Sequence, residues 1–312
     1  MSSIVTITLN PALDESFGID RLLPERKLRC SPPVIHPGGG GINVARVAAR
    51  LDAEVFALWI GGGPEGQMLA DLLEGERIRH VGVPAPHGPR RSFHVSEHAT
   101  GAFYRFVLPG PELTEEDGAR VAAELERCGD ADLVVISGSL PPTLRPDTYA
   151  RLAAQAAPRA RVVLDTSGEA LARGLAGDVY LAKPNRNELA RLVGRELGAQ
   201  AEVVSAARTL ITAGRVEVVA VSLGSEGLHW VTREDDEHIA APEVTPVSAV
   251  GAGDSTVAGI VVGLARGLPL PAAMRLGVAA GTAAVMTPGT DLCRAEDVAR
   301  LYDALPARTP AH

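Results

Sequence analysis

A series of short, continuous apolar runs constrains the fold of this 312-residue chain more than any other feature. A strand that is apolar at every position is buried on both faces, which is typical of a parallel sheet covered by helices on both sides. The runs occupy residues 4–9, 55–60, 133–136, 162–164, 179–181 and 218–223. Helix-like stretches occupy residues 42–51, 67–73, 118–126, 149–157, 188–193, 203–213, 255–265 and 272–286. We therefore predict an α/β fold with a mainly parallel sheet.

One region breaks this alternation of strands and helices. Residues 92–98 and 102–108 flank a Thr100-Gly101 turn and have the pattern of a β-hairpin, and residues 15–34 form a further extended stretch. Three of the five phenylalanines lie in the hairpin and a fourth is Phe17, which predicts an exposed apolar face. We expect a small β-sheet that stands off the main domain and associates with a second copy of the chain.

Composition and charge argue against several classes of protein. The chain is 46% hydrophobic, enough for one large α/β domain or two small ones. No apolar run approaches the roughly 18 residues of a membrane span, and residues 1–4 lead into the first strand without a basic segment. The formal charge of −8 argues against a nucleic-acid surface, which needs a basic stripe. We therefore expect a cytoplasmic protein that binds neither membranes nor nucleic acid.

The cysteines and histidines show no metal-site pattern. Cys30, Cys128 and Cys293 are scattered and odd in number, so they predict neither a disulfide framework nor a metal-ligand pair. His94 and His98 lie in a predicted strand, so they do not share a helical face. The sequence assigns no role to the histidines.

The glycine turn at residues 248–255, which leads into an apolar helix, is the main candidate for chemistry. Backbone N–H groups of such a turn, at a helix N-terminus, form a cavity for an anion such as phosphate. Asp254 would then lie within reach of a hydroxyl group held against that phosphate, as a general base does. The alternative is a plain loop with a helix cap.

A second glycine run precedes a predicted helix near the amino terminus. Residues 38–41 are four consecutive glycines, which permit close approach of the backbone to a ligand, and Asn43 offers a donor and an acceptor to sugar hydroxyls. The alternative is a flexible turn with Asn43 facing solvent. The chain entropy that four glycines cost favours the ligand-binding interpretation.

Residues 61–66 match the G-x-G-x-x-G pattern of dinucleotide-binding folds. Such a site needs an acidic residue about 20 positions further on, and residues 80–86 supply none. The turn is therefore predicted only to join a strand to a helix, and an NAD-dependent oxidoreductase built on it remains an alternative. No G-x-x-x-x-G-K-[ST] sequence is present, which excludes an ordinary P-loop.

Small polar residues follow several predicted strands, where open α/β sheets bind ligands. Asn185 and Glu188 lie three apart on a first helical turn and can hold water around Mg²⁺. A helix cap with Glu188 at its third position is the alternative. Residues 137–142 and 222–227 also end apolar runs, either as ligand loops or as plain turns.

Basic side chains gather around the predicted hairpin. Arg90, Arg91 and Arg105 lie in or beside it, and Lys27 and Arg29 lie on the earlier extended stretch. Together they would grip a phosphate group already on the substrate. The alternative is a solvated charged face of the small sheet.

Residues 38–43, 183–188 and 251–254 occur in the order and spacing of the ribokinase-like sugar kinases, the PfkB carbohydrate kinase family. The chain resembles this family over essentially its whole length. Within the family it is similar to the 6-phosphofructokinase branch at residues 24–30, 37–46, 104–110, 137–142 and 250–255.

The resemblance implies a single three-layer α/β/α ribokinase-like domain over residues 1–312, with a mainly parallel sheet. It also implies a small β-sheet lid, formed by about residues 15–35 and 89–109, that serves as the clasp of a homodimer. The implied reaction is ATP-dependent phosphorylation of fructose 6-phosphate at its 1-hydroxyl.

The resemblance further implies roles for individual residues. Asp254 is the general base, and the transferring phosphoryl group is stabilised by the amides of Gly251, Ala252 and Gly253. The sugar hydroxyls are held by Asp14, Gly39 and Asn43, and the 6-phosphate by Lys27, Arg90, Arg105 and Ser139. ATP is bound by Lys183, Asn185, Ser222, Gly224, Ser225 and Gly227. Mg²⁺ is organised through water by Asn185 and Glu188, and K⁺ is bound by carbonyls at Ser248, Val250 and Gly289.

Other sugar kinases of the family stay open as alternatives. Those acting on fructose 1-phosphate and tagatose 6-phosphate resemble the chain but usually carry Lys where Gly40 stands. Gly40 therefore favours a 6-phosphofructokinase over a 1-phosphofructokinase or a tagatose-6-phosphate kinase. Tagatose 6-phosphate differs from fructose 6-phosphate in the configuration of one hydroxyl, so the sequence does not separate the two. A sugar-phosphate sensor without turnover is a further alternative, against which Asp254 stands.

Overall fold

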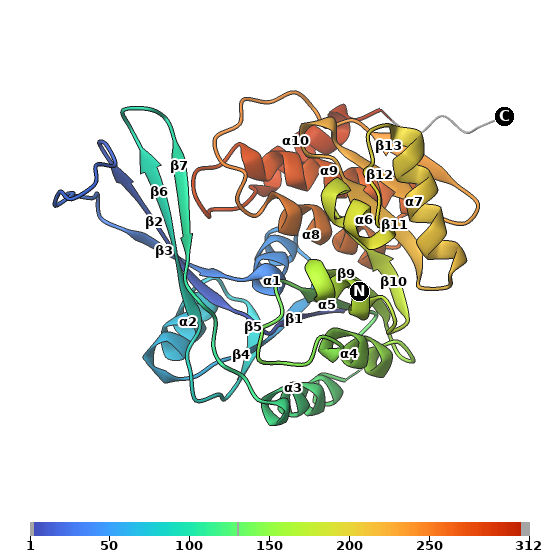
Figure 1. Ribbon diagram of the computed structural model, residues 1–312, viewed down its shortest axis with the longest axis horizontal. Coiled ribbons are helices and arrows are strands. Elements are labelled where there is room, and N and C mark those ends of the chain that lie inside the picture. The colour runs from blue at the N-terminus through green and yellow to red at the C-terminus, as the bar shows by residue number, and fades with distance from the viewer. Residues whose placement is uncertain (1–2, 130, 307–312) are drawn as a thin grey trace.

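The computed structural model describes residues 3–129 and 131–306 and contains one large and one small β-sheet (Figure 1). The large sheet has nine strands in the order β13-β12-β11-β10-β9-β8-β1-β4-β5. Neighbouring strands are parallel, except that β12 runs antiparallel to β11 and to β13. The strands are β1 (Ile4–Thr8), β4 (Val55–Ile60), β5 (Arg79–Val83), β8 (Leu133–Ser137), β9 (Arg161–Asp165), β10 (Val179–Ala182), β11 (Val216–Ser222), β12 (Leu228–Val231) and β13 (Asp236–Ile239).

Helices cover both faces of the large sheet. One face carries α1 (Gly40–Arg50), α2 (Gly63–Gly75), α8 (Ala252–Ala265), α9 (Leu270–Val285) and α10 (Ala295–Ala304). The other face carries α3 (Glu115–Arg127), α4 (Thr148–Ala156), α5 (Gly168–Gly174), α6 (Arg186–Val193) and α7 (Gln200–Thr212). Successive strand residues alternate between the two buried clusters, as Ile4 and Val5 of β1 do. The predicted three-layer α/β/α fold is therefore confirmed.

Each of the six predicted apolar runs is a strand of the large sheet. The sequence pattern does not predict three strands of the large sheet, β5, β12 and β13, nor the helices α5 and α10. Helix α2 begins earlier than predicted because Pro64 occupies its first turn, where no backbone N–H is needed. The first two and last six residues of the predicted 1–312 unit lie outside the described residues. Within the described chain, none of the helices has both the length and the apolar character that crossing a membrane requires.

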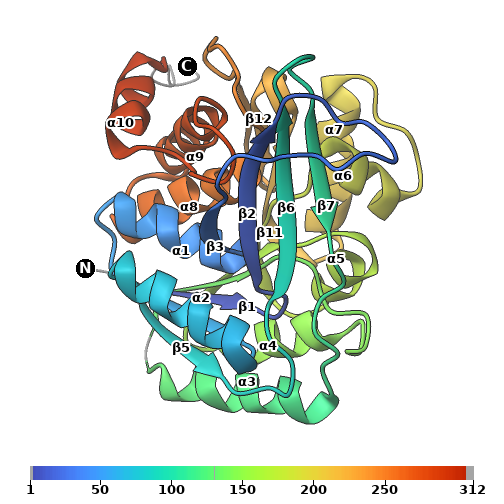
Figure 2. The same ribbon diagram turned by 90° about the vertical axis from the view of Figure 1, so that its left-hand side faces the viewer.

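The small sheet stands beside the main body, with its strands in the order β3-β2-β6-β7 (Figures 1 and 2). Its strands are β2 (Ala12–Ile19), β3 (Val34–Gly38), β6 (Arg90–Glu97) and β7 (Phe103–Val107). The predicted hairpin is the antiparallel pair of β6 and β7. The predicted extended stretch is interrupted, because residues 20–33 form a loop that contains Pro24, Pro32 and Pro33.

Helix α8 is buried along most of its length and packs closely against α9. A Cβ added at Gly259 would lie 2.5 Å from the carbonyl oxygen of Leu276. A Cβ added at Gly277 would lie 2.9 Å from the carbonyl oxygen of Thr256. The two helices therefore touch through their backbones, and this contact holds the first turn of α8 in place against the core.

Candidate active site

The predicted catalytic turn lies at the amino end of α8. Gly251 adopts φ 72°, a left-handed conformation that glycine tolerates, and the N–H groups after it belong to the first helical turn, which lacks intrahelical partners. Asn43, in the first turn of α1, donates from Nδ2 to Oδ2 of Asp254 at 2.8 Å. The starts of two helices from distant parts of the chain thus meet at Asp254.

The environment of Asp254 makes it a stronger base than an ordinary aspartate. Burial raises the pKa of Asp254 to about 6, and the negative charge of Asp165 acts in the same direction. The hydrogen bond from Asn43 and the ammonium of Lys183 lower the pKa and limit the rise. A carboxyl group with a pKa near 6 is ionised at pH 7 and can accept a proton from a hydroxyl group.

Lys183 lies beside the same turn and is paired with a carboxylate that the sequence analysis missed. Its Nζ is 3.1 Å from Oδ1 of Asp165, the last residue of β9. Burial alone lowers the pKa of Lys183, but the Asp165 carboxylate outweighs it, so the pKa lies above its usual value and the side chain is charged. A Cβ added at Gly253 would lie 3.6 Å from that Nζ, so the ammonium sits next to the predicted anion-binding turn.

Asp14 and the glycine run form the next part of the site. Asp14, on β2, is buried, and a Cβ added at Gly38 would lie 2.1 Å from its Oδ2. Gly39 adopts φ 105° as the residue before α1, a conformation that suits glycine. The charge of Asp14 contributes to the raised pKa of Asp254, which places both carboxylates in one electrostatic environment.

Ser139 is joined to the site by Asn10, a second residue that the sequence analysis missed. Asn10 follows β1, and its Nδ2 donates to Oγ of Ser139 at 2.9 Å. Asn10 and Asp165 share one signal, because each is the first polar residue after a predicted apolar run. A polar residue at the carboxyl end of a parallel strand is therefore the feature that would have found both.

The structure brings together some of the predicted basic residues. Arg90 is half-buried on β6, where burial and the charge of Arg105 lower its pKa and the Asp14 carboxylate raises it. Arg105 is exposed on β7. Lys27 is exposed on the 20–33 loop, and within the described part of the chain it has no hydrogen bond or ion pair to another predicted site residue.

The predicted nucleotide residues meet where α6 begins and β11 ends. Asn185 and Glu188 form a capping box, in which Oδ1 of Asn185 accepts from the Glu188 amide and Oε2 of Glu188 accepts from the Asn185 amide, at 2.9 and 2.8 Å. A bridge joins Asn185 to Ser222. The loop after it forms a short 3₁₀ turn, η1 (Gly224–Glu226), which holds Gly224 and Ser225, and Gly227 follows it. Both predicted roles of the 185–188 pair, cap and water-mediated Mg²⁺ site, use oxygen atoms of the same turn.

The three residues predicted for K⁺ are adjacent in space. Oγ of Ser248 donates to the carbonyl oxygen of Gly289 at 3.1 Å and accepts from the Val250 amide at 3.2 Å. Together they bring the loop before α8 against the loop after α9. In the described ranges, no group of three or more His, Cys, Asp or Glu side chains is arranged to hold a metal ion.

The small sheet is tied to the large domain through the same loop. The hydroxyl of Thr290 lies 3.3 Å from Oγ of Ser16 and 2.9 Å from Nδ1 of His36. A buried arginine, Arg46, donates to the carbonyl of Pro37 at 3.0 Å. The base of the small sheet is thus fixed to the core next to Gly289.

The G-x-G-x-x-G turn is not part of this site. Its Gly62 is packed against a neighbouring loop, because a Cβ there would lie 2.1 Å from the carbonyl oxygen of Ala85, and its amide donates to the carbonyl of His87 at 3.0 Å. The strand before it, β4, lies next to the sheet edge. This packing agrees with a turn that only joins a strand to a helix.

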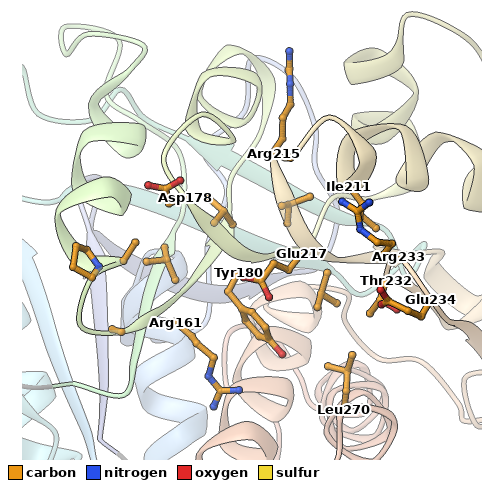
Figure 3. Close-up of a pocket in the computed structure, with 18 residues that line it drawn as sticks. Arg161, Asp178, Tyr180, Ile211, Arg215, Glu217, Thr232, Arg233, Glu234 and Leu270 are labelled. Carbon is orange, nitrogen blue, oxygen red and sulfur yellow. The ribbon is translucent and has the colours of Figure 1, made fainter.

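Figure 3 shows a separate cavity of about 780 Å³ at the amino ends of β9, β10 and β11. Arg161 lies over the ring of Tyr180 at its wall, with Cζ 5.2 Å from the ring centroid. In this view Arg161 and Arg215 extend in opposite directions, so they do not converge on one ligand. The cavity contains none of the predicted site residues. It lies at the amino ends of the strands, whereas open α/β folds bind ligands at the carboxyl ends.

Comparison with known proteins finds carbohydrate kinases that match nearly the whole chain. A family model for "pfkB family carbohydrate kinase" matches residues 4–297. The ATP-dependent 6-phosphofructokinase isozyme 2 of Mycobacterium tuberculosis (strain ATCC 25618 / H37Rv) is 43% identical over 305 residues, which cover 96% of this chain and 89% of the relative. The protein of the same name from Escherichia coli (strain K12) is 40% identical over 304 residues, with 97% and 98% covered. The 1-phosphofructokinase of Bacillus subtilis (strain 168) is 34% identical over 281 residues, with 90% and 91% covered.

Solved structures show the same similarity. Phosphofructokinase-2 from Escherichia coli in complex with fructose-6-phosphate has a TM-score of 0.92 and 38% identity, with 98% of this chain and 99% of that chain covered. The same protein has been solved in complex with potassium and in a tetrameric inhibited form, both with a TM-score of 0.92, 39% identity, and 97% and 99% covered.

Proposed function

Because the chain belongs to the pfkB family of carbohydrate kinases, we propose that it is an ATP-dependent 6-phosphofructokinase. It transfers a phosphoryl group from ATP to the 1-hydroxyl of fructose 6-phosphate. Relatives of that name are 40% and 43% identical to the chain over nearly its whole length. The observation that carries the proposal is the Asn43–Asp254 hydrogen bond at the glycine turn that begins α8.

Phosphoryl transfer depends on positioning and charge neutralisation more than on covalent help. Asn43 engages Oδ2 of Asp254, which leaves Oδ1 to accept the proton of the sugar 1-hydroxyl. The amides of Gly251, Ala252 and Gly253 face the transferring phosphoryl group from the amino end of α8, where the helix dipole adds a favourable field. Base and anion cradle therefore belong to one rigid turn.

The acceptor sugar phosphate lies between the start of α1 and the small sheet in this proposal. Asp14, Gly39 and Asn43 hold its hydroxyl groups. Its 6-phosphate is bound by Arg90, Arg105, Ser139 and Lys27, the last as the basic residue of the 20–33 loop. The nearby Asp14 carboxylate and half-buried Arg90 support this placement, since their charges act on one another.

ATP binds on the other side of the catalytic turn. Lys183, held by Asp165, approaches its phosphates, and the nucleotide is lined by Asn185, Ser222, Gly224, Ser225 and Gly227. Mg²⁺, which neutralises phosphate charge in kinases, is held through water by Asn185 and Glu188. K⁺ binds the carbonyls of Ser248, Val250 and Gly289, a proposal supported by the potassium complex of the Escherichia coli relative.

Gly40 is the observation that favours fructose 6-phosphate over the substrates of related kinases. A Cβ at this position would lie 2.4 Å from Oγ of Ser137 and 2.6 Å from the amide nitrogen of Gly138. The Lys that the related kinases usually carry would therefore require the 137–138 backbone to move. That backbone leads directly to Ser139, which we propose as a ligand of the 6-phosphate.

The small sheet acts as a lid and as an interface in this proposal. The lid is formed by about residues 15–35 and 89–109 of a single domain spanning residues 1–312. Several apolar side chains of this region are exposed, among them Val34, Phe106 and Val107, at 55%, 47% and 55%. Such a patch suits a second copy of the chain, so we propose a homodimer. Light scattering tests this, and a monomer at micromolar concentration, or a tetramer like the inhibited Escherichia coli form, would contradict it.

The function is tested by ADP release with Mg·ATP and a panel of acceptors: fructose 6-phosphate, tagatose 6-phosphate, fructose 1-phosphate, ribose and adenosine. We expect the highest kcat/KM for fructose 6-phosphate. A higher kcat/KM for another sugar would support the kinase activity and contradict fructose 6-phosphate as the substrate. Binding without turnover would indicate a sensor, and stabilisation by NAD alone would indicate an oxidoreductase. The soluble fraction of the cytoplasm is where we propose that the protein acts, and cell fractionation tests this.

A further inference from the structure

His94, to which the sequence analysis gave no role, is a buried polar side chain next to the proposed sugar site. It lies on β6 and is 1% exposed, and neither of its ring nitrogens has a hydrogen-bond partner among the described residues. A buried polar atom without a partner lowers the stability of the fold, so such atoms are usually hydrogen-bonded. A buried imidazole in this position therefore suggests a role outside folding.

The strand register places His94 on the same face of the small sheet as Asp14. His94 is paired with Ser16 on β2 and with Arg105 on β7, and Asp14 is two residues before Ser16. The ring of Phe103 lies beside the imidazole, 6.1 Å away between centroids, and the hydroxyl of the paired Ser16 is engaged with Thr290 at 3.3 Å.

The Asp14 carboxylate is the acceptor within reach of this imidazole. Nε2 of His94 lies 3.5 Å from Oδ1 of Asp14, slightly longer than an ordinary N–H···O hydrogen bond. The other oxygen, Oδ2, lies over Gly38, where a Cβ would be only 2.1 Å away. Gly38 directly precedes the residues that begin α1, so Oδ2 is directed towards the proposed sugar site.

We propose that His94 is a positioning residue for the acceptor sugar. Its Nε2–H donates to Oδ1 of Asp14 and fixes the rotation of the carboxylate, so that Oδ2 is presented to a sugar hydroxyl group. A terminal carboxylate otherwise rotates freely between broad, two-fold related positions. The inference rests on the proposed function in taking Asp14 as a ligand of the sugar.

The test is a double-mutant cycle in the full-length protein. His94→Gln keeps an amide N–H near the position of Nε2, whereas the shorter side chain of His94→Asn reaches only the position of Nδ1. Each is made in the wild-type and Asp14→Ala backgrounds. Ser96→Ala, an exposed position on the same face of β6, is the matched control. The measurements are KM for the sugar, KM for ATP, kcat and the urea midpoint of unfolding.

We expect His94→Asn to raise KM for the sugar ~10-fold with kcat and KM for ATP nearly unchanged, and His94→Gln to restore most of the wild-type value. In the Asp14→Ala background the two His94 variants should have the same KM. Equal effects of His94→Asn in both backgrounds, or no advantage of Gln over Asn, would overturn the inference and leave His94 a packing residue. Cooperative unfolding of His94→Gln ensures that this comparison is made on folded protein.

The sugar in these assays is the one with the highest kcat/KM in the acceptor panel. If that sugar is not fructose 6-phosphate, the proposed substrate fails while the role of His94 is still tested with the sugar that is used. If Asp14→Ala leaves KM for that sugar unchanged, the inference about His94 fails and the kinase activity stands. Absence of phosphorylation of every sugar would overturn both.

Discussion

The two sides of the site are built differently. On the side of the large sheet, each charged group has a close partner: Asp254 has Asn43 at 2.8 Å, and Lys183 has Asp165 at 3.1 Å. On the side of the small sheet, Arg105 is exposed and the ring nitrogens of His94 lack hydrogen-bond partners in the described chain. If the proposed site is right, we expect the core side to be arranged for phosphoryl transfer before substrate arrives, and the lid side to need the sugar phosphate to complete its contacts.

Replacing the base gives the largest expected difference between the two sides. We expect Asp254→Asn to lower kcat by ~10³-fold, the middle of the range for loss of a general base, with a small change in KM for the sugar. Steady-state kinetics with fructose 6-phosphate measure this. A variant that keeps its rate would remove Asp254 from the mechanism.

Loss of the Lys183–Asp165 ion pair should reduce stability far more than loss of an exposed charge on the lid. Lys183→Met leaves the largely buried Asp165 carboxylate without its ammonium partner, which should lower the free energy of unfolding by about 3 kcal/mol, the low end for a broken buried pair. Arg105→Met removes the same charge from the exposed lid and should change it by less than about 0.5 kcal/mol. Urea unfolding of the two variants tests this contrast. Equal losses of unfolding free energy would mean that charged groups contribute no more to stability on the core side than on the lid side.

The raised pKa of Asp254 predicts that its ionisation lowers the stability of the fold in a pH-dependent way. Its folded pKa of about 6 exceeds the ordinary 3.8, so ionisation destabilises the fold as pH rises through this window and the full cost applies above about pH 6. Asp254→Asn cannot ionise, so its stability relative to wild type should rise between pH 4 and pH 7, by up to about 3 kcal/mol. Thermal unfolding across this range would show a constant difference if the pKa were ordinary.

The smallest expected effect lies on the lid. Arg105→Met should raise KM for fructose 6-phosphate ~10-fold and leave kcat and KM for ATP close to wild type, because its contact is made equally in the ground and transition states. Fructose without its 6-phosphate should bind the variant and the wild type equally. A fall in kcat without a change in KM would place Arg105 among the groups that stabilise the transition state.

The same contrast explains what the sequence predicts. The catalytic turn is a local pattern, since glycines, a carboxylate and an apolar helix follow one another between residues 248 and 265. Asp165 acts through Lys183, which directly follows the neighbouring strand β10, and such a partnership depends on the order of strands in the sheet. The role of His94 depends on the parallel pairing of β2 with β6, which joins segments about 80 residues apart. The role of a single polar residue at a strand end can be predicted only when the neighbouring strands in the sheet are known.

The small sheet also shows why a pattern of extended residues is a weak guide to strand limits. A turn and aromatic residues mark the hairpin strands in the sequence, whereas the stretch before the hairpin contains Pro24, Pro32 and Pro33, which lie in the loop between β2 and β3. This loop holds Lys27, which makes no hydrogen bond or ion pair with the other predicted site residues in the described chain. Strand propensity therefore predicts that a small sheet is present, and the proline positions predict where its loop lies.

The close contact between α8 and α9 has a consequence for the effect of natural mutations. Any side chain at Gly259 or Gly277 would push apart the two helices whose contact holds the catalytic turn. Substitutions there would lower the amount of folded protein in the cell and would also loosen the turn that holds Asp254. A variant at either glycine is therefore expected to lose abundance and catalytic rate together, whereas a variant in the exposed loops around the site would change the rate alone.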